Sequence, residues 1–266
     1  MSKRVELNLC GLSLALAAAL VLSACSQAEG QSAHASTGGG HGAAPHWTYE
    51  EAAEWGELSE EFAACAAGAR QSPVDLTAAS TIASVEVMFD YVPGPVEILN
   101  NSHTIQVNFP EGNRAVIGGE SYNLLQFHFH APSEHAIEGR REVLEAHFVH
   151  RNAAGELAVF GVLMREGAEN ATLAPLWAAM PESAGSPTPV AGLIFDPRPL
   201  MPTHERFTTY DGSLTTPPCS EGVRWFVFRD YSSVGAEQVR RFLDVVHENA
   251  RPLQPRNARA FGIVRG

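Results

Sequence analysis

Histidines alternate with phenylalanines in the segment Gln126-Phe-His-Phe-His130, and a third histidine follows in Glu145-Ala-His147. Successive side chains of a β-strand point to opposite faces, so an extended chain here places His128 and His130 on one face. The intervening residues include proline, glycine and several charges, which are enough to turn the chain. The residues around His147 again alternate loosely. We therefore predict two neighbouring antiparallel strands that bring His147 to the first pair.

Three imidazoles on one sheet face form a donor set that suits a borderline metal, most of all Zn²⁺. Three protein ligands leave a fourth tetrahedral position for water, as in catalytic zinc sites, whereas structural zinc sites usually close with cysteine. No Cys lies near these histidines. Gln126 and Glu145 are candidates to hold the rings through hydrogen bonds. The alternative is a polar strand face on which the histidines are incidental.

The first 24 residues predict an export signal. Two basic residues precede an apolar run that is too short for a spanning helix and ends in Leu-Ser-Ala-Cys at residues 22–25. This ending is typical of a bacterial lipoprotein, in which Cys25 becomes the lipidated first residue; a plain signal cut near Ala24 is the alternative. Residues 25–45, rich in Ser, Gly, Ala and His, predict a flexible tether. We expect an exported, periplasmic or cell-envelope protein with a membrane anchor at Cys25.

Residues 46–266 are long enough for one large core and contain no repeat, charge block or second linker. We therefore predict a single domain over this range. A net charge of −12 argues against nucleic acid as a partner. Two cysteines, Cys65 and Cys219, fall within the domain. An oxidising compartment favours a disulfide between them, and two free buried thiols are the alternative.

Short strand-like runs dominate the domain, and helical patterns are weaker. We expect strands at residues 85–91, 96–99, 104–109, 123–129, 143–150, 157–164 and 224–228, and helices at 56–65, 173–180 and 236–249. A serine at 232 or 233 offers an N-cap for the last helix. The pattern predicts a mainly β, α+β domain with peripheral helices.

Further motifs occur in a fixed order around the histidines. They are His46-Trp-Thr-Tyr49, Arg70-Gln-Ser-Pro-Val-Asp75, Asn100-Asn-Ser-His103, Pro132-Ser-Glu-His135, Tyr210-Asp-Gly-Ser-Leu-Thr-Thr-Pro-Pro218 and Asn249-Ala-Arg-Pro-Leu-Gln254. With these motifs the chain resembles the α-class carbonic anhydrases from about residue 46 to 261. The resemblance implies a large central twisted, mostly antiparallel sheet and the zinc-dependent, reversible hydration of CO₂ to bicarbonate and a proton.

The resemblance also implies roles for individual residues. Zinc on the three histidines would provide the hydroxide that attacks CO₂. Thr215 would accept a hydrogen bond from that hydroxide and donate one to the Glu134 carboxylate, which can only accept, so the direction of the Thr proton is fixed. His103 would export the proton through bridging waters, because imidazole titrates near neutral pH.

Other implied roles concern the surroundings of the metal. The ligands would be held by Gln126 on His128, Glu145 on His147 and the main-chain carbonyl of Asn249 on His130. Substrate would meet a pocket formed by Val149, Val159, Leu214, Val223 and Trp225, with Thr216 contributing to bicarbonate binding. Secreted members of the family carry a disulfide at the positions of Cys65 and Cys219. The partner is a small molecule, CO₂ or bicarbonate, and the chain is expected to be a monomer or a homodimer.

Two other functions stay open at this point. The spacing from His128 through His130 to Glu134 superficially fits a cupin-like enzyme, with Glu134 as a ligand to iron or manganese, although the expected Pro-x-Gly lead-in before His147 is absent. A non-catalytic zinc-binding or adhesion module on the same fold is the third possibility. It would be favoured if a ligand or Thr215 were missing, and all are present.

Overall fold

The computed structural model describes residues 45–77, 81–83, 85–204 and 206–265. The expected export signal, the lipidation at Cys25 and nearly all of the tether lie outside the described residues. Within them, no helix has the length and apolar character needed to cross a membrane.

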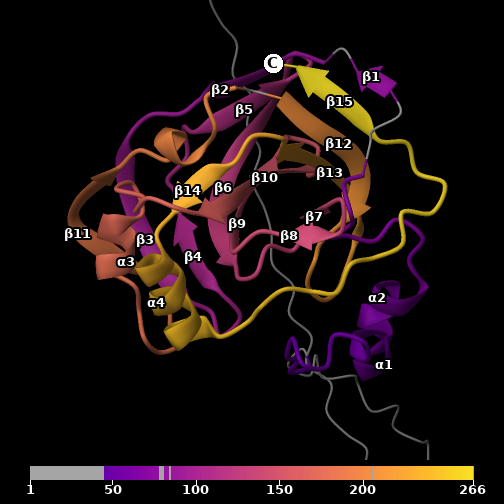
Figure 1. The fold of residues 1–266 in the computed structure, drawn as a ribbon, viewed down its shortest axis with the longest axis horizontal. Coiled ribbons are helices and arrows are strands. Elements are labelled where there is room, and N and C mark those ends of the chain that lie inside the picture. The colour runs from indigo at the N-terminus through magenta and orange to yellow at the C-terminus, as the bar shows by residue number, and fades with distance from the viewer. Residues whose placement is uncertain (1–44, 78–80, 84, 205, 266) are drawn as a thin grey trace, which may run out of the picture. The chain divides into compact units, whose positions relative to one another are not determined.

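The domain is built on a thirteen-stranded sheet that twists through its centre (Figure 1). Three of its strand pairs are parallel, β1 with β15 and β10 with β13 and β14, and the others are antiparallel. The main path runs in the order β1 (Thr81–Ala83), β15 (Gly262–Arg265), β12 (Arg206–Ser213), β13 (Glu221–Phe228), β10 (Leu157–Glu166), β9 (Leu144–Arg151), β6 (Glu120–His130), β4 (Ile105–Asn108), β3 (Gly94–Asn100) and β11 (Thr188–Phe195), and off this path lie β14 (Ser232–Val234), β2 (Val87–Asp90) and β5 (Arg114–Ile117). The predicted fold class is confirmed.

The helices are short and lie at the periphery of the sheet (Figure 1). They are α1 (Trp55–Leu58), η1 (Glu60–Phe62), α2 (Ala64–Ala67), α3 (Ala174–Ala178), η2 (Arg198–Leu200) and α4 (Ala236–Val246), and a separate two-stranded ribbon pairs β7 (Ala136–Ile137) with β8 (Arg140–Arg141). The helix expected at residues 56–65 is therefore wrong as one element, because the chain there breaks into three short pieces.

The start and end of α4 also differ from the prediction. Its N-cap is Gly235 rather than a serine, because Ser232 and Ser233 pair with β10 as part of β14. The Gln238 side chain accepts the Gly235 N–H at 3.1 Å and so replaces the expected cap. The helix ends at Val246, before the predicted residue 249, since His247 adopts a positive φ of 64°.

The central strands separate two cores. Odd-numbered aromatic residues of β6, Phe127 and Phe129, pack into the larger hydrophobic cluster on one face. Strand register places the histidines on the opposite face, in line with Val159 and Trp225 of a smaller apolar cluster. The alternation that defines the histidine motif thus corresponds to a sheet with apolar packing on one side and the polar site on the other.

Cys65 and Cys219 form a disulfide, which confirms the predicted pairing and excludes the two free thiols. The bond closes a loop with a sequence separation of 154 residues. On the chain-entropy model such a closure stabilises the fold by about 5 kcal/mol, less any strain. A disulfide also indicates folding in an oxidising environment.

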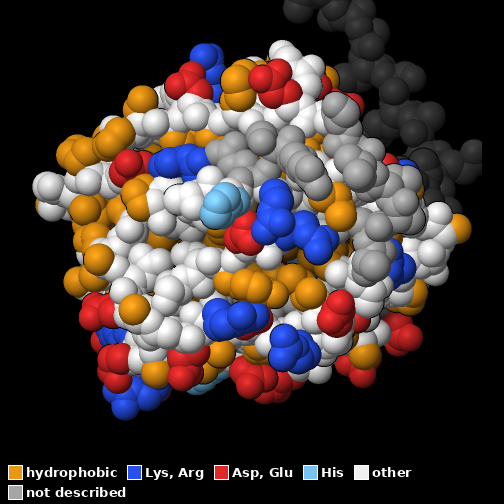
Figure 2. Space-filling model, turned by 45° about the horizontal axis from the view of Figure 1, so that its top comes forward, with side chains coloured by type: hydrophobic (Ala, Val, Ile, Leu, Met, Phe, Trp, Pro, Cys, Tyr) orange, Lys and Arg blue, Asp and Glu red, His pale blue; other side chains and the backbone are white. Residues whose placement is uncertain are grey.

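Charged side chains of both signs are interspersed on the face in Figure 2. Some of the exposed charges form ion pairs, such as Arg206 with Asp230 at 2.7 Å and Arg165 with Glu142 at 2.6 Å.

His150 is a fully buried histidine on the aromatic face of the sheet. Its Nδ1 donates to the Phe148 carbonyl at 2.9 Å, so its Nε2 accepts from the Tyr91 hydroxyl at 2.6 Å. Burial lowers the pKa of His150 from its ordinary 6.5 to about 4, because the charged form would lose its hydration.

This depressed pKa predicts an acid-dependent loss of stability. Below pH 6.5 the His150 imidazole takes up a proton in the unfolded chain but stays neutral in the folded chain. The contribution of His150 to the free energy of unfolding is therefore complete above that pH. It is lost as pH falls towards 4, by about 3 kcal/mol in the free energy of unfolding. Denaturant unfolding at several pH values should show a shallower pH dependence for His150→Phe than for the parent; identical slopes would contradict the prediction.

Candidate active site

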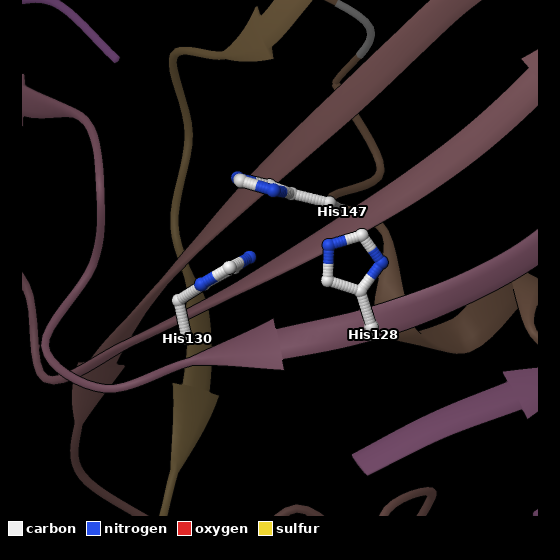
Figure 3. Close-up of side chains that lie close together, drawn as sticks. All are labelled: His128, His130 and His147. Carbon is white, nitrogen blue, oxygen red and sulfur yellow. The ribbon is translucent and has the colours of Figure 1, made fainter. Parts of the chain in front are cut away.

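The three histidines converge from two neighbouring strands, with β6 supplying His128 and His130 and β9 supplying His147 (Figure 3). The antiparallel register pairs His128 directly with His147. One nitrogen of each ring lies within 4.8 Å of the others. His130 and His147 are buried and His128 is partly buried. The prediction that two adjacent strands bring the three rings together is confirmed.

The far nitrogen of each ring faces a different partner. His128 Nδ1 lies 2.8 Å from Gln126 Oε1, and His130 Nδ1 donates to the Asn249 carbonyl at 2.8 Å. His147 presents Nε2 to the Glu145 carboxylate at 3.0 Å. These contacts leave Nε2 of the first two rings and Nδ1 of the third directed to the common centre.

Burial and charge set the protonation of the rings. Burial, and then the neighbouring imidazoles, hold the pKa of His128 well below its ordinary value, and burial also lowers the pKa of His130. Burial likewise lowers the pKa of His147, but the Glu145 and Glu134 carboxylates together raise it more, so its net shift is upward. Two of the rings are therefore neutral at physiological pH, the form in which imidazole binds a metal.

Glu145 is shared between two histidines. Its Oε1 lies 2.8 Å from His135 Nδ1 as well as near His147, and its Oε2 accepts the His135 backbone N–H at 2.8 Å. Burial raises the pKa of this carboxyl, but the two imidazoles lower it by more, so the pKa of Glu145 lies well below its ordinary value. The space for the carboxylate depends on Gly161, where a Cβ would lie 2.7 Å from Glu145 Oε1. Sequence analysis did not identify Gly161, because its neighbour comes from strand pairing.

Glu134 is a buried carboxylate beside the triad, with its Oε2 atom 3.6 Å from His130 Nε2 and 3.8 Å from His147 Nδ1. Its Oε1 accepts the Arg251 backbone N–H at 2.9 Å, while Oε2 has no hydrogen-bond partner among the described residues. Thr215 is also buried. The hydrogen bond from Thr215 to Glu134 is not formed within the described part of the chain, so that role stays a prediction.

His103 lies beside a cavity of about 130 Å³ that is also lined by His128 and His130 of the triad. Gln106, Gln126, His128 and Thr216 contribute to the cavity wall. The His103 ring stacks on Trp47, with ring centroids 3.7 Å apart and planes 6° from parallel. Burial, and then nearby His46, lower the pKa of His103 from its ordinary 6.5. A half-buried imidazole thus borders both the cavity and the outer surface.

The five expected pocket residues come together in the smaller apolar cluster on the histidine face. Val159, Val223 and Trp225 are buried, and Val149 and Leu214 pack against them. The Trp225 ring contacts His147, with centroids 4.8 Å apart. None of the five lines the cavity beside His103, so their contact with substrate stays a prediction.

The segment 249–251 closes the site from a distant part of the chain, and sequence analysis identified only one of its contacts. Besides the Asn249 carbonyl, it supplies the Arg251 N–H to Glu134. The Arg251 guanidinium is buried and donates to the carbonyls of Cys65 and Ser72 and to Gln71 Oε1. Burial lowers the pKa of Arg251 to about 10, which still leaves it charged at neutral pH.

The donor set fits Zn²⁺. It consists of three imidazoles without cysteine; His130 Nε2 within it and Glu134 Oε2 beside it are buried and have no hydrogen-bond partner in the described residues. Buried polar atoms are rarely unpartnered, and a cation among the three rings would satisfy the nitrogen. Glu134 Oε2 lies at the edge of this group and not among the atoms that converge. The geometry favours three nitrogen ligands over the cupin-like set.

Known proteins match this chain over most of its length. The family model described as eukaryotic-type carbonic anhydrase matches residues 50–262. The carbonic anhydrase of Pectobacterium atrosepticum is 40% identical over 249 residues, 91% of this chain and 96% of the relative, and that of Neisseria gonorrhoeae is 42% identical over 224 residues, 82% and 88%. The α-carbonic anhydrase of Thermovibrio ammonificans, solved with the inhibitor sulfanilamide, superposes with a TM-score of 0.80 at 39% identity, covering 84% of this chain and all of that one.

Proposed function

Because the chain belongs to the α-carbonic anhydrase family and is an enzyme that hydrates CO₂, we propose that it does so with zinc on His128, His130 and His147 and with His103 as the proton shuttle. The observation that supports the proposal most strongly is the convergence of three imidazole nitrogens whose other ring nitrogens all face fixed partners. Bound zinc would lower the pKa of a coordinated water and so make hydroxide available at neutral pH, a property for which carbonic anhydrases are the standard example.

The protein residues around the metal orient the reactants. We propose that Thr215 donates its hydroxyl proton to Glu134 Oε2, the oxygen that lacks a partner within the described residues. A carboxylate only accepts hydrogen bonds, so the Thr oxygen would then offer a lone pair to the attacking hydroxide and aim it at CO₂. The Arg251 N–H on Oε1 supports this role, since it fixes the carboxylate plane. The apolar cluster around Trp225 would supply the dry wall that CO₂ needs, with Thr216 binding bicarbonate.

Proton export is assigned to His103. Its ring borders the cavity and is only partly buried, so it can exchange protons with bulk water. A pKa below 6.5 keeps the ring largely neutral at pH 7, ready to accept a proton. The stacked Trp47 ring supports the assignment because it limits the rotation of the imidazole.

The compartment and anchor complete the proposal. The disulfide is consistent with an exported domain, and we propose that residues 1–24 are an export signal and that lipidated Cys25 tethers the domain in the periplasm or cell envelope through residues 25–45.

Metal removal tests the central claim. Purified protein should contain stoichiometric zinc by atomic spectroscopy, lose CO₂ hydration on treatment with a zinc chelator and regain it with added Zn²⁺. Iron or manganese in place of zinc, or full activity in metal-free protein, would refute the proposed centre and reopen the cupin-like alternative.

Two substitutions should separate proton export from substrate orientation. His103→Ala should lower turnover at saturating CO₂ by about tenfold or more, because proton transfer by a placed side chain contributes at least that much, and small imidazole buffers should restore it. Thr215→Val should also lower activity, but imidazole should not restore it, since orientation is lost rather than a proton acceptor. Zinc content should be unchanged in both variants, and an unaltered rate in either would remove that residue's role.

Cys25→Ser tests the anchor. Loss of the lipidated thiol should move the protein from the membrane fraction to the soluble fraction, because the tether itself contains no apolar segment. Cell fractionation with immunodetection measures this, and export of the variant can be confirmed by intact Cys65–Cys219 pairing. Continued membrane association of Cys25→Ser would contradict lipid anchoring.

A further inference from the structure

Asn249 uses all of its hydrogen-bonding groups in one small region. Its backbone N–H donates to the Ala131 carbonyl at 3.1 Å, and its carbonyl accepts from His130. Its side-chain Oδ1 accepts the Ala131 N–H at 2.8 Å, and Nδ2 donates to the carbonyls of Phe129 and His103, both at 2.9 Å. The residue is 1% exposed. Only its backbone carbonyl acts on a metal ligand, so the amide side chain has a separate task.

The Asn249 side-chain amide joins the turn that carries His103 to the end of strand β6. Phe129 and Ala131 flank the ligand His130 at the end of β6, whereas His103 lies in the turn before β4. No strand ladder joins the His103 carbonyl to β6, because β4 pairs with β6 only from Gln106 onward. The Asn249 side chain therefore spans the gap between the shuttle turn and the ligand strand.

The turn that carries His103 has its own internal supports. Asn101 Oδ1 accepts the backbone N–H groups of His103 and Thr104 at 3.0 and 2.9 Å. The Thr104 hydroxyl donates to the Phe129 carbonyl at 2.5 Å, the same carbonyl that Asn249 contacts. The turn is thus rigid within itself and is fastened to the β6 end at two points, Thr104 and Asn249.

We propose that Asn249 is a positioning residue for proton transfer. Its side-chain amide holds the His103 turn at a fixed place relative to the metal ligands. The inference rests on the proposed shuttle role of His103. Transfer through waters depends on a constant separation of donor and acceptor, and small displacements reduce it strongly. An amide is suited to this task because it offers one acceptor and two donors in a plane, whereas a carboxylate of the same shape offers no donor.

The test removes the amide and leaves every backbone contact in place. Asn249→Ala should lower turnover at saturating CO₂ by about three- to tenfold, since the shuttle is displaced and not deleted. The proton leaves after bicarbonate is formed, so kcat/KM should change much less, and imidazole buffer should restore turnover. Amide exchange of the 103–104 turn should also accelerate, in a readout independent of activity.

A double-variant cycle separates positioning from general support. If Asn249 acts through His103, Asn249→Ala should cause no further loss of turnover in a His103→Ala background. Additive losses, or equal falls in turnover and kcat/KM without rescue, would overturn the inference. If His103→Ala itself leaves turnover unchanged, the shuttle assignment fails instead, so the two failures are distinguishable.

Two further variants guard against loss of folding. Asn113 is another buried asparagine, whose Oδ1 accepts the Val92 N–H at 2.8 Å far along the chain from the site, and Asn113→Ala should leave turnover unchanged. Thr104→Val removes the second fastening of the same turn and should reproduce the imidazole-rescued loss. Failure of Thr104→Val to do so, with zinc content intact, would contradict the proposal even if Asn249→Ala does not fold.

Discussion

The site depends on what holds the far nitrogen of each imidazole. A ring with one free nitrogen can rotate and exchange tautomers, and three such rings would not present their lone pairs to a common point. Here the holding groups come from three places: Gln126 lies two residues before His128 on β6, Glu145 lies two residues before His147 on β9, and Asn249 comes from the C-terminal segment. The convergence of the three rings therefore requires the register of β6 with β9 and the docking of the C-terminal segment at the same time.

The two-sided packing of β6 explains how the ligands keep their positions. Each histidine alternates with a fully buried phenylalanine, and Phe127 and Phe129 pack edge to face with ring centroids 5.5 Å apart. A slip of one residue would exchange the aromatic and imidazole faces, burying polar rings in the larger core. The aromatic face thus specifies the register, and the register brings His128 opposite His147. Ligand precision follows from core packing on the other side of the sheet.

Local patterns predicted those parts of the molecule that local physics determines. Alternation identified β6, β9 and β10, and with them the triad, within a few residues. It missed β11 and β12: β11 is an edge strand with exposed residues on both faces, and β12 carries a Thr-Thr-Tyr-Asp-Gly run without clear apolar alternation. The predicted helix at 56–65 is divided at Ser59, which adopts an extended backbone between α1 and η1 and accepts the Glu61 N–H with its side chain. Partners far apart in sequence, such as Gly161 with Glu145, have no local signal, and only the family resemblance supplied the carbonyl of Asn249.

One connected network links the disulfide to Thr215 and Glu134, the pair that we propose orients the reactants. Cys219 donates its backbone N–H to the Thr216 carbonyl at 2.8 Å, so the covalent bond fixes the turn that carries Thr215. At the other cysteine of the disulfide, the Cys65 carbonyl accepts from the buried guanidinium of Arg251. The backbone N–H of Arg251 donates to Glu134. Thr215 and Glu134 are thus positioned from opposite ends of the same crosslink. A buried guanidinium without a carboxylate partner is costly unless its donors find acceptors, and the two carbonyls and the Gln71 amide oxygen that accept from its Nη1 and Nη2 belong to the N-terminal segment of the domain. The first residues of the fold and the segment after α4 are therefore held together beside Glu134, which explains why motifs at both ends of the domain accompany the histidine triad in its middle.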